Sequence, residues 1–221
     1  MNQLSTAQTI MVWALPVLFA ITVHEVAHGW VAFKLGDPTA KAMGRLTLNP
    51  VKHIDPVGTL LVPLVSFMLG GFIFGWAKPV PVNPSFFRHF RRDSALVAAA
   101  GPLSNLLMAL VWALMTKLAI VLHGSSPLDT TYLIYAGAAG IAINCILMVL
   151  NLVPIPPLDG SRVVSGFLSY RWSVVYNRLE PYGFLILILL LTMGILGNLI
   201  MPLVDYCQYA ILSLFSLPSI Y

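Results

Sequence analysis

The chain of 221 residues is 58% hydrophobic and only 9% charged, with a mean hydropathy of +0.86 and a net charge of +4. A soluble domain carries about 25% charged residues, so this composition excludes a water-soluble globular protein. It indicates an integral membrane protein formed by one domain, residues 1–221. The small net charge gives no reason to expect nucleic acid as a partner, and basic residues are better interpreted as topology signals.

The apolar segments predict an all-α polytopic membrane protein with four to six transmembrane helices, since a span needs about 20 apolar residues. The N-terminus lacks the basic region and small-residue site of a signal peptide, so no cleavable leader is expected. The segments fall at about 8–33, 58–75, 94–122, 131–157 and 182–204, followed by a weaker apolar tail at 207–221.

Basic side chains gather in three connections, which the positive-inside rule assigns to the cytoplasmic side. Two of these connections flank 58–75, so this segment either re-enters the membrane or spans it briefly; its proline and glycines favour re-entry. Four true spans then remain, with both termini outside. The first connection holds Lys34, Lys41, Arg45 and Lys52. The second holds Lys78, Arg88, Arg91 and Arg92, and the third holds Arg162, Arg171 and Arg178.

The stretch "GWAKPVPVNPSFF" (75–87) carries three closely spaced prolines, which preclude a regular helix. Its alternating valines favour an extended, strand-like edge between the first and later spans. Such an edge can pair with an extended peptide. A plain surface loop is the alternative.

The first apolar segment contains "HEVAH", which places His24 and His28 at i and i+4 on one face of a helix. Both imidazoles can reach one ion, and Glu25 can reach a water on it. This spacing is the zinc-binding pattern in which the glutamate is the general base. A polar helix-packing cluster without metal is the alternative, although three ionisable groups in lipid are costly without an ion.

Catalytic zinc sites usually have three protein ligands, so a further ligand is expected. His53 lies in a polar connection after Pro50 and is expected to be a loop histidine, although it is the nearest candidate downstream. His89 and His123 are not expected to be ligands. The stronger candidate is Asp159 in "NLVPIPPLDG", where prolines end a long apolar segment and Gly160 permits an unusual turn.

The expected topology supports this pairing, because the first and fourth segments both run from outside to inside. His24, His28 and Asp159 then approach the cytoplasmic side at one depth. Asn144 and Asn151 share a helical face beside small residues that permit close helix approach, Ala136, Gly137 and Gly140.

The remaining polar and sulfur-bearing candidates have simpler interpretations. Asn105 and Asn144 are expected to form hydrogen bonds between helices. Cys145 and Cys207 are expected to be small buried hydrophobic residues.

"HEVAH" followed by "NLVPIPPLDG" resembles the site-2 protease family of intramembrane zinc metalloproteases, in its compact prokaryotic type without PDZ or CBS domains. "AGPLSN", "GRLTLNPVKHIDPVGT" and "GWAKPVPVNP" also resemble stretches of that type, so the resemblance covers roughly residues 17–165. It implies one zinc ion held by His24, His28 and Asp159. It further implies that Glu25 is the catalytic base and that Asn151 helps to hold substrate.

The expected function is therefore hydrolysis of peptide bonds within or near transmembrane segments of protein or peptide substrates. The site would face the cytoplasmic side of a bacterial or archaeal cell membrane, and the lipid bilayer would be a partner. The alternative is a metal-binding membrane protein without hydrolysis, such as a metal transporter. A transporter has no need of Glu25 after His24, and it would require a polar path on both sides.

Overall fold

The computed structural model describes residues 5–62, 65, 68, 75, 77–123 and 130–218. Its regular elements are all helical, and no strand occurs within these residues. In chain order they are α1 (Thr6–Lys34), α2 (Thr39–Ala42), the short helices η1 (Pro50–His53), η2 (Pro56–Leu61) and η3 (Pro84–Phe86), α4 (Phe90–Leu122), α5 (Thr131–Leu152), α6 (Asp159–Phe167), α7 (Tyr170–Asn177), α8 (Glu180–Thr192) and α9 (Ile195–Leu214).

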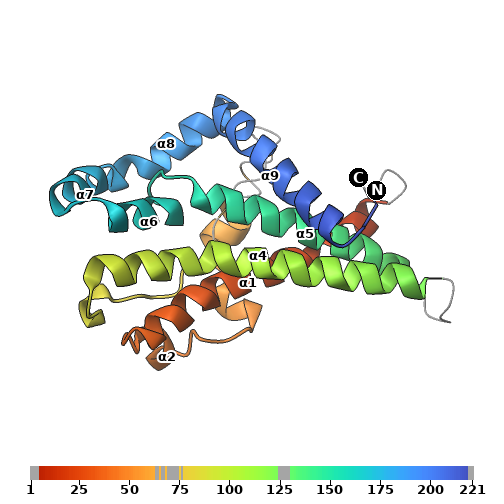
Figure 1. Cartoon of the computed structure of the whole chain (residues 1–221), viewed down its shortest axis with the longest axis horizontal. Helices are drawn as coiled ribbons and strands as arrows, with labels where there is room; N and C mark the ends of the chain where they lie inside the picture. The colour runs from red at the N-terminus through yellow and green to blue at the C-terminus, as the bar shows by residue number, and fades with distance from the viewer. Residues whose placement is uncertain are drawn as a thin grey trace.

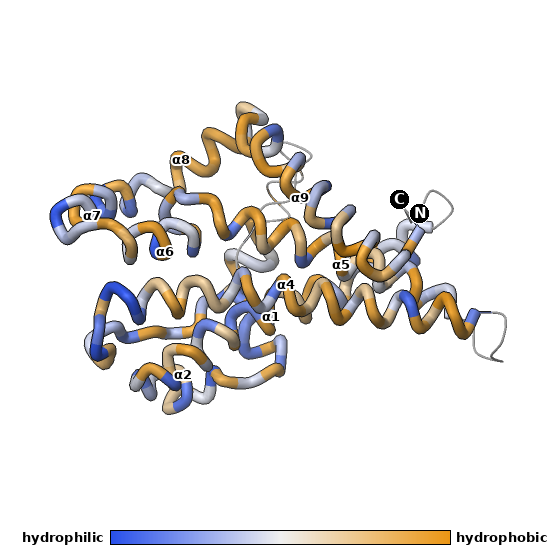
Figure 2. The backbone as a smooth tube through the Cα atoms, in the orientation of Figure 1, coloured by the Kyte–Doolittle hydropathy of each residue, from blue (hydrophilic) through white to orange (hydrophobic). Residues whose placement is uncertain are grey.

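Four of these helices, α1, α4, α5 and α9, are long and apolar enough to cross a membrane. The pair α7 and α8, bent by 58° at a short break, is a fifth candidate. Figure 2 shows apolar residues along the long helices and hydrophilic residues where α2, α7 and the beginning of α4 lie. The chain is therefore a polytopic all-α membrane protein, which confirms the expected fold class.

Three of the long helices, α1, α4 and α5, pack into one group. Helix α4 contacts both α1 and α5, and α1 also contacts α5 (Figure 1). Small residues permit this packing. A Cβ atom on Gly137 would overlap Thr116 of α4, and one on Gly140 would overlap the ring of Trp112. The expectation that small residues in this segment allow close helix approach is confirmed.

The C-terminal part differs from the single apolar segment expected at 182–204. It divides at Gly194, whose φ of 72° is left-handed, so that α8 ends and α9 begins there. Helix α9 then continues to Leu214 and takes in part of the tail expected after 207. The hydropathy pattern missed the break because the residues on both sides are equally apolar.

The main core lies where α8 and α9 fold back over α4 and α5, and it includes Trp112, Ile141, Leu187 and Val204. Cys145 is buried in this core and Cys207 is half-buried beside it, both as free thiols, as expected. Helix α1 begins and α9 ends at the same end of the molecule, which agrees with an even number of crossings (Figure 1).

The element expected at 58–75 lies mostly outside the described residues. Those that are described include the end of the short helix Pro56–Leu61 and helical backbone at Val62, Val65 and Met68. Within 77–83 the chain forms no strand, and Pro84–Phe86 forms one turn of 3-10 helix. The prediction that the prolines preclude any helix was wrong here, because a proline fits the first position of a helical turn.

Candidate metal centre

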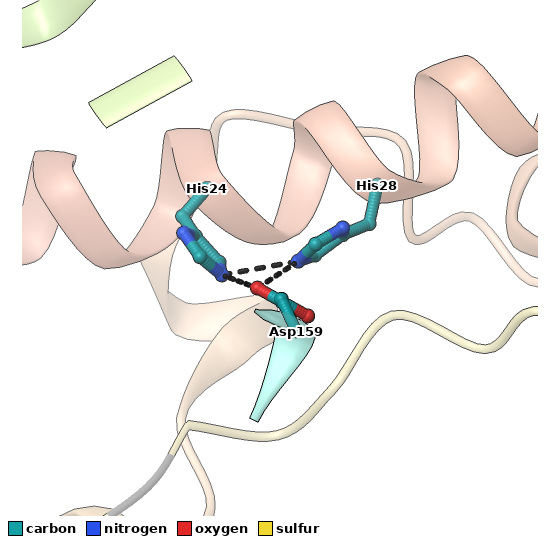
Figure 3. Close-up of side chains that lie close together, drawn as sticks. All are labelled: His24, His28 and Asp159. Carbon is teal, nitrogen blue, oxygen red and sulfur yellow. Dashed lines mark hydrogen bonds and ion pairs between the residues drawn. The ribbon is translucent and has the colours of Figure 1, made fainter. Parts of the chain in front are cut away.

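Three side chains from two distant segments meet at one point (Figure 3). His24 Nε2 and His28 Nε2 lie 3.0 Å apart. Asp159 Oδ2 lies 3.2 Å from the first and 3.3 Å from the second. Both histidines project from α1 and the carboxylate from the first turn of α6, so the sequence prediction that "PPLDG" meets "HEVAH" agrees with the geometry.

The proline-rich junction between α5 and α6 presents Asp159 to α1. Helix α5 ends at Leu152 before Pro154, which lacks the N–H that would continue the helix. The Tyr176 hydroxyl donates to the Pro154 carbonyl at 2.7 Å. Gly183 of α8 lies so close to the Pro156 carbonyl that any Cβ there would overlap it. The junction is thus supported from α7 and α8.

Gly160 serves this junction in a different way from the one expected. Its φ is not positive, so the sequence prediction of an unusual turn was wrong. A Cβ atom at this position would instead overlap the Leu152 carbonyl. Glycine is required because the beginning of α6 packs against the last turn of α5.

Each histidine is oriented through its other ring nitrogen. His24 Nδ1 lies 2.6 Å from Asn105 Oδ1, and His28 Nδ1 lies 2.7 Å from the Val97 carbonyl. Both partners are acceptors, so each Nδ1 carries the proton and each Nε2 presents a lone pair. This is the arrangement by which proteins orient metal-bound histidines.

A chain of amides extends this orientation through the helix group. Asn105 Nδ2 donates to Asn144 Oδ1 at 2.9 Å and to the Ala20 carbonyl at 3.3 Å. Asn144 Nδ2 donates in turn to the Gly140 carbonyl at 2.8 Å. Both asparagines are fully buried. The expected hydrogen bonding between helices is confirmed, and it also reaches His24, which the sequence did not indicate.

Gly101 of α4 leaves the space in front of the histidines open. A Cβ atom there would lie 2.5 Å from His24 Cε1 and 2.5 Å from His28 Nε2. Any larger residue would therefore fill the space where the histidine nitrogens converge. The sequence marked 100–105 only as a small-residue motif, because this contact depends on the packing of α4 against α1.

The donor set fits a metal ion. With neutral imidazoles, two nitrogen lone pairs and a carboxylate oxygen face one another with no proton between them, and Asp159 Oδ2 is buried without a hydrogen bond. Burial raises the pKa of the Asp159 carboxyl, but the contact with the His24 and His28 rings outweighs burial and lowers the pKa to about 2. Asp159 is therefore ionised at neutral pH, as metal binding would require.

The spacing also suits zinc. Ligand atoms about 2.0–2.1 Å from a tetrahedral zinc ion lie roughly 3.3 Å from one another. The three observed separations are 3.0, 3.2 and 3.3 Å. Two imidazoles, one carboxylate and an open fourth position are typical of catalytic zinc sites.

Glu25 follows His24 on α1 and does not belong to the group of possible metal ligands. Its Oε2 accepts a hydrogen bond of 2.8 Å from the backbone N–H of Val80. The base expected from the sequence thus lies beside the site, and it contacts the 75–87 stretch that was expected to meet substrate.

The other sequence candidates lie apart from the three ligand atoms. Asn151 Nδ2 donates to the Leu147 carbonyl of its own helix at 2.9 Å. His53 is buried in η1, with Nε2 2.9 Å from the Thr47 carbonyl, and His123 Nδ1 lies 2.9 Å from Thr130 Oγ1. Within the described residues neither of these histidines nor His89 joins the group of possible metal ligands.

Comparison with known proteins gives several relatives that are named as zinc metalloproteases. YwhC of Bacillus subtilis is 36% identical over 209 residues, which cover 90% of this chain and 89% of YwhC. Rip2 of Mycobacterium tuberculosis is 34% identical over 152 residues, covering 68% of this chain and 55% of Rip2. MJ0611 of Methanocaldococcus jannaschii is 32% identical over 90 residues, 41% of this chain and 42% of MJ0611.

No family model matches the chain, and no solved structure gives a match. The identity with YwhC extends over nearly the whole of both proteins. The chain therefore belongs to the zinc metalloprotease family of YwhC and Rip2.

Proposed function

We propose that this chain is an intramembrane zinc metalloendopeptidase of the site-2 protease type. One observation carries the proposal. His24 and His28 lie on an apolar helix long enough to cross a membrane, and Asp159 meets them there, so that the two Nε2 atoms and Oδ2 lie within 3.3 Å of one another. Glu25 stands next to the first ligand. The family named in the comparisons supports hydrolysis of peptide bonds, and the apolar setting supports substrates that lie in the membrane.

His24, His28 and Asp159 would hold one zinc ion. A bound zinc ion supplies a Lewis acid that polarises a carbonyl and acidifies a water molecule. Glu25 would take the proton from a water molecule as the water attacks the scissile carbonyl, and would then give that proton to the departing amine. Asn105 and the Val97 carbonyl keep the two imidazoles in the tautomer that leaves Nε2 free.

The substrate class follows from where the site lies. A transmembrane helix hides its amides in internal hydrogen bonds, so a substrate helix must unwind before attack. The 75–87 stretch bonds to Glu25 through the Val80 N–H, and its residues 77–83 belong to no helix or strand, which suits pairing with an extended segment. Asn151 uses its side-chain N–H within its own helix, and its carbonyl oxygen would accept a hydrogen bond from substrate.

The basic connections support a catalytic end that faces the cytoplasm under the positive-inside rule. Arg91, Arg92 and Arg162 belong to segments at the hydrophilic end shown in Figure 2. The proposed location is the cell membrane of a prokaryote, with cleavage near its cytoplasmic face.

Replacing Glu25 with Gln tests the proposal against a transporter or an inactive metal binder. The protease requires zinc to be retained and cleavage to be lost. The measurements are zinc content by mass spectrometry and a comparison of membrane-protein fragments in cells that carry wild type or E25Q. Identical fragment sets in the two strains would refute Glu25 as the base, whereas metal transport by wild type and E25Q alike would favour the alternative.

A further inference from the structure

A short segment without regular secondary structure runs along α1 at the catalytic glutamate; we name residues 78–83 the strap. Its first residue, Lys78, is held through both its backbone N–H and its carbonyl. Arg45 Nη2 donates to the Lys78 carbonyl at 2.9 Å and to the Pro79 carbonyl at 3.4 Å. The Lys78 N–H donates to the His53 carbonyl at 2.9 Å.

Arg45 is an unusual anchor, because it is 8% exposed and no carboxylate of the described residues lies within 4.0 Å of its guanidinium. Its Nε is buried without a partner. Burying a charge with no opposite charge is costly. An arginine that served only as a topology signal would be exposed to solvent, so this one has a local task, which is to hold two strap carbonyls.

The far end of the strap has a second buried anchor. The Asn83 N–H donates to Asp37 Oδ2 at 2.6 Å, and Asp37 Oδ1 accepts from the N–H of Thr39 at 2.9 Å. Asp37 is completely buried. Asp37 and Arg45 both lie in the connection that follows α1. These two anchors therefore tie the strap to the helix that carries the catalytic residues.

Between the two anchors the strap bonds to Glu25. The Val80 N–H donates to Glu25 Oε2, and the Val80 side chain is 6% exposed and packs against Gly29 one turn further along α1. A Cβ at Gly29 would lie 2.6 Å from Val80 Cγ1. Within the described residues no hydrogen bond to Oε1 is present. The Val80 N–H therefore holds the base through one of its two carboxylate oxygens.

We propose that Arg45 is a positioning residue for catalysis, which acts through the strap by holding the Val80 N–H against Glu25. The inference rests on the proposed function, since it assumes that Glu25 is the base. It assigns a role to a residue outside the metal group and explains its buried, unpaired charge. Removal of either Arg45 or the Val80 N–H leaves Glu25 free to rotate.

The test observes Glu25 directly. The chain has only two glutamates, Glu25 and Glu180. Protein made with glutamate labelled with carbon-13 at Cδ therefore gives two carboxylate resonances, which E25Q assigns. We expect R45Q and V80P to shift or broaden the Glu25 resonance. We expect V82P to leave it at the wild-type position, because the Val82 N–H does not contact Glu25. Lys52, exposed in the same connection, supplies the matched charge control K52Q.

A kinetic arm separates positioning from folding and from substrate binding. The probe is β-casein, whose unfolded chain needs no helix unwinding. We expect R45Q and V80P to lower kcat about 10–100-fold, with zinc content unchanged and KM within about twofold of wild type. If R45Q fails to fold, V80P still decides the question, because it removes one hydrogen bond and leaves the guanidinium in place.

A Glu25 resonance at the wild-type position in V80P, or in folded R45Q, would overturn the inference. So would a fall in kcat that is accompanied by an equal loss of zinc, which would indicate general damage. Failure of the proposed function would look different: wild type and E25Q would cleave β-casein equally, whatever the resonances show.

Discussion

Asn105 Oδ1 lies 2.6 Å from His24 Nδ1, although 81 positions separate the two residues in the chain. The contact joins α4 to α1 at the candidate metal centre and makes the ring present Nε2 to Asp159. It converts a histidine in an apolar helix into an oriented ligand.

Replacing Asn105 with Ala should weaken zinc binding about 10–100-fold, because the imidazole loses the acceptor that fixes its tautomer. Asn105→Asp keeps an acceptor oxygen at this position and should restore part of the affinity. Competition with a zinc-binding dye measures both values. Ser104→Ala removes a neighbouring hydroxyl that bonds only within α4 and serves as the control. Equal affinities for N105A and S104A would contradict the role given to Asn105.

Replacing Gly101 with Ala should lower zinc affinity at least about 10-fold, because the new methyl would lie 2.5 Å from His28 Nε2. Gly197→Ala in α9 is the matched change, since its Cβ would have nothing within 4 Å. The control should keep its zinc and gain about 0.5–1 kcal/mol of helix stability. Zinc titration and thermal unfolding distinguish the two variants, and normal zinc affinity in G101A would show that the space is not needed.

Removal of zinc by a chelator should lower the Tm of the wild type by about 5–10 °C, since a tightly bound ligand stabilises the state that binds it. Asp159→Asn replaces an ionised ligand with a neutral amide and should abolish this difference. The measurement is thermal unfolding in detergent before and after dialysis against chelator, with zinc added back as a check. A D159N protein that still gained stability from zinc would argue against Asp159 as a ligand.

Replacing Gly137 with Ala should destabilise the protein by about 1–3 kcal/mol, because the methyl overlaps Thr116 across the contact between α4 and α5. Zinc affinity should change little, since the site lies elsewhere in the group. G137A with T116A tests the cause, because alanine lacks the Oγ1 atom that the new methyl overlaps. Unchanged thermal stability in G137A would mean that the two helices can separate without cost.

The sequence predicted those parts of the site that depend on local spacing. His24 and His28 share a face because four residues make about one helical turn. Asp159 could be found because prolines end α5 just before it, and because an acidic group beside an apolar segment indicates a functional role. The long helices α1, α4 and α5 were predictable from hydropathy alone.

The remaining features depend on contacts that no spacing rule reports. Asn105 and Gly101 reach the histidines only because α4 packs across α1. Arg45 resembled any other basic residue in a cytoplasmic connection until its burial and its bonds to Lys78 and Pro79 were known. Gly194 was missed because a left-handed turn between two apolar stretches leaves the hydropathy unchanged.

The Pro156 carbonyl rests on Gly183, and the Tyr176 hydroxyl holds the Pro154 carbonyl. The segment that presents Asp159 to the two histidines is thus braced by residues that follow it in the chain. A truncated protein ending at Phe167 would contain both histidines, Glu25 and Asp159, and yet would lack this brace. A shortened chain that contains all the site residues can therefore still lack the support that holds them in place. Shortened versions of this chain should be designed to end beyond α8.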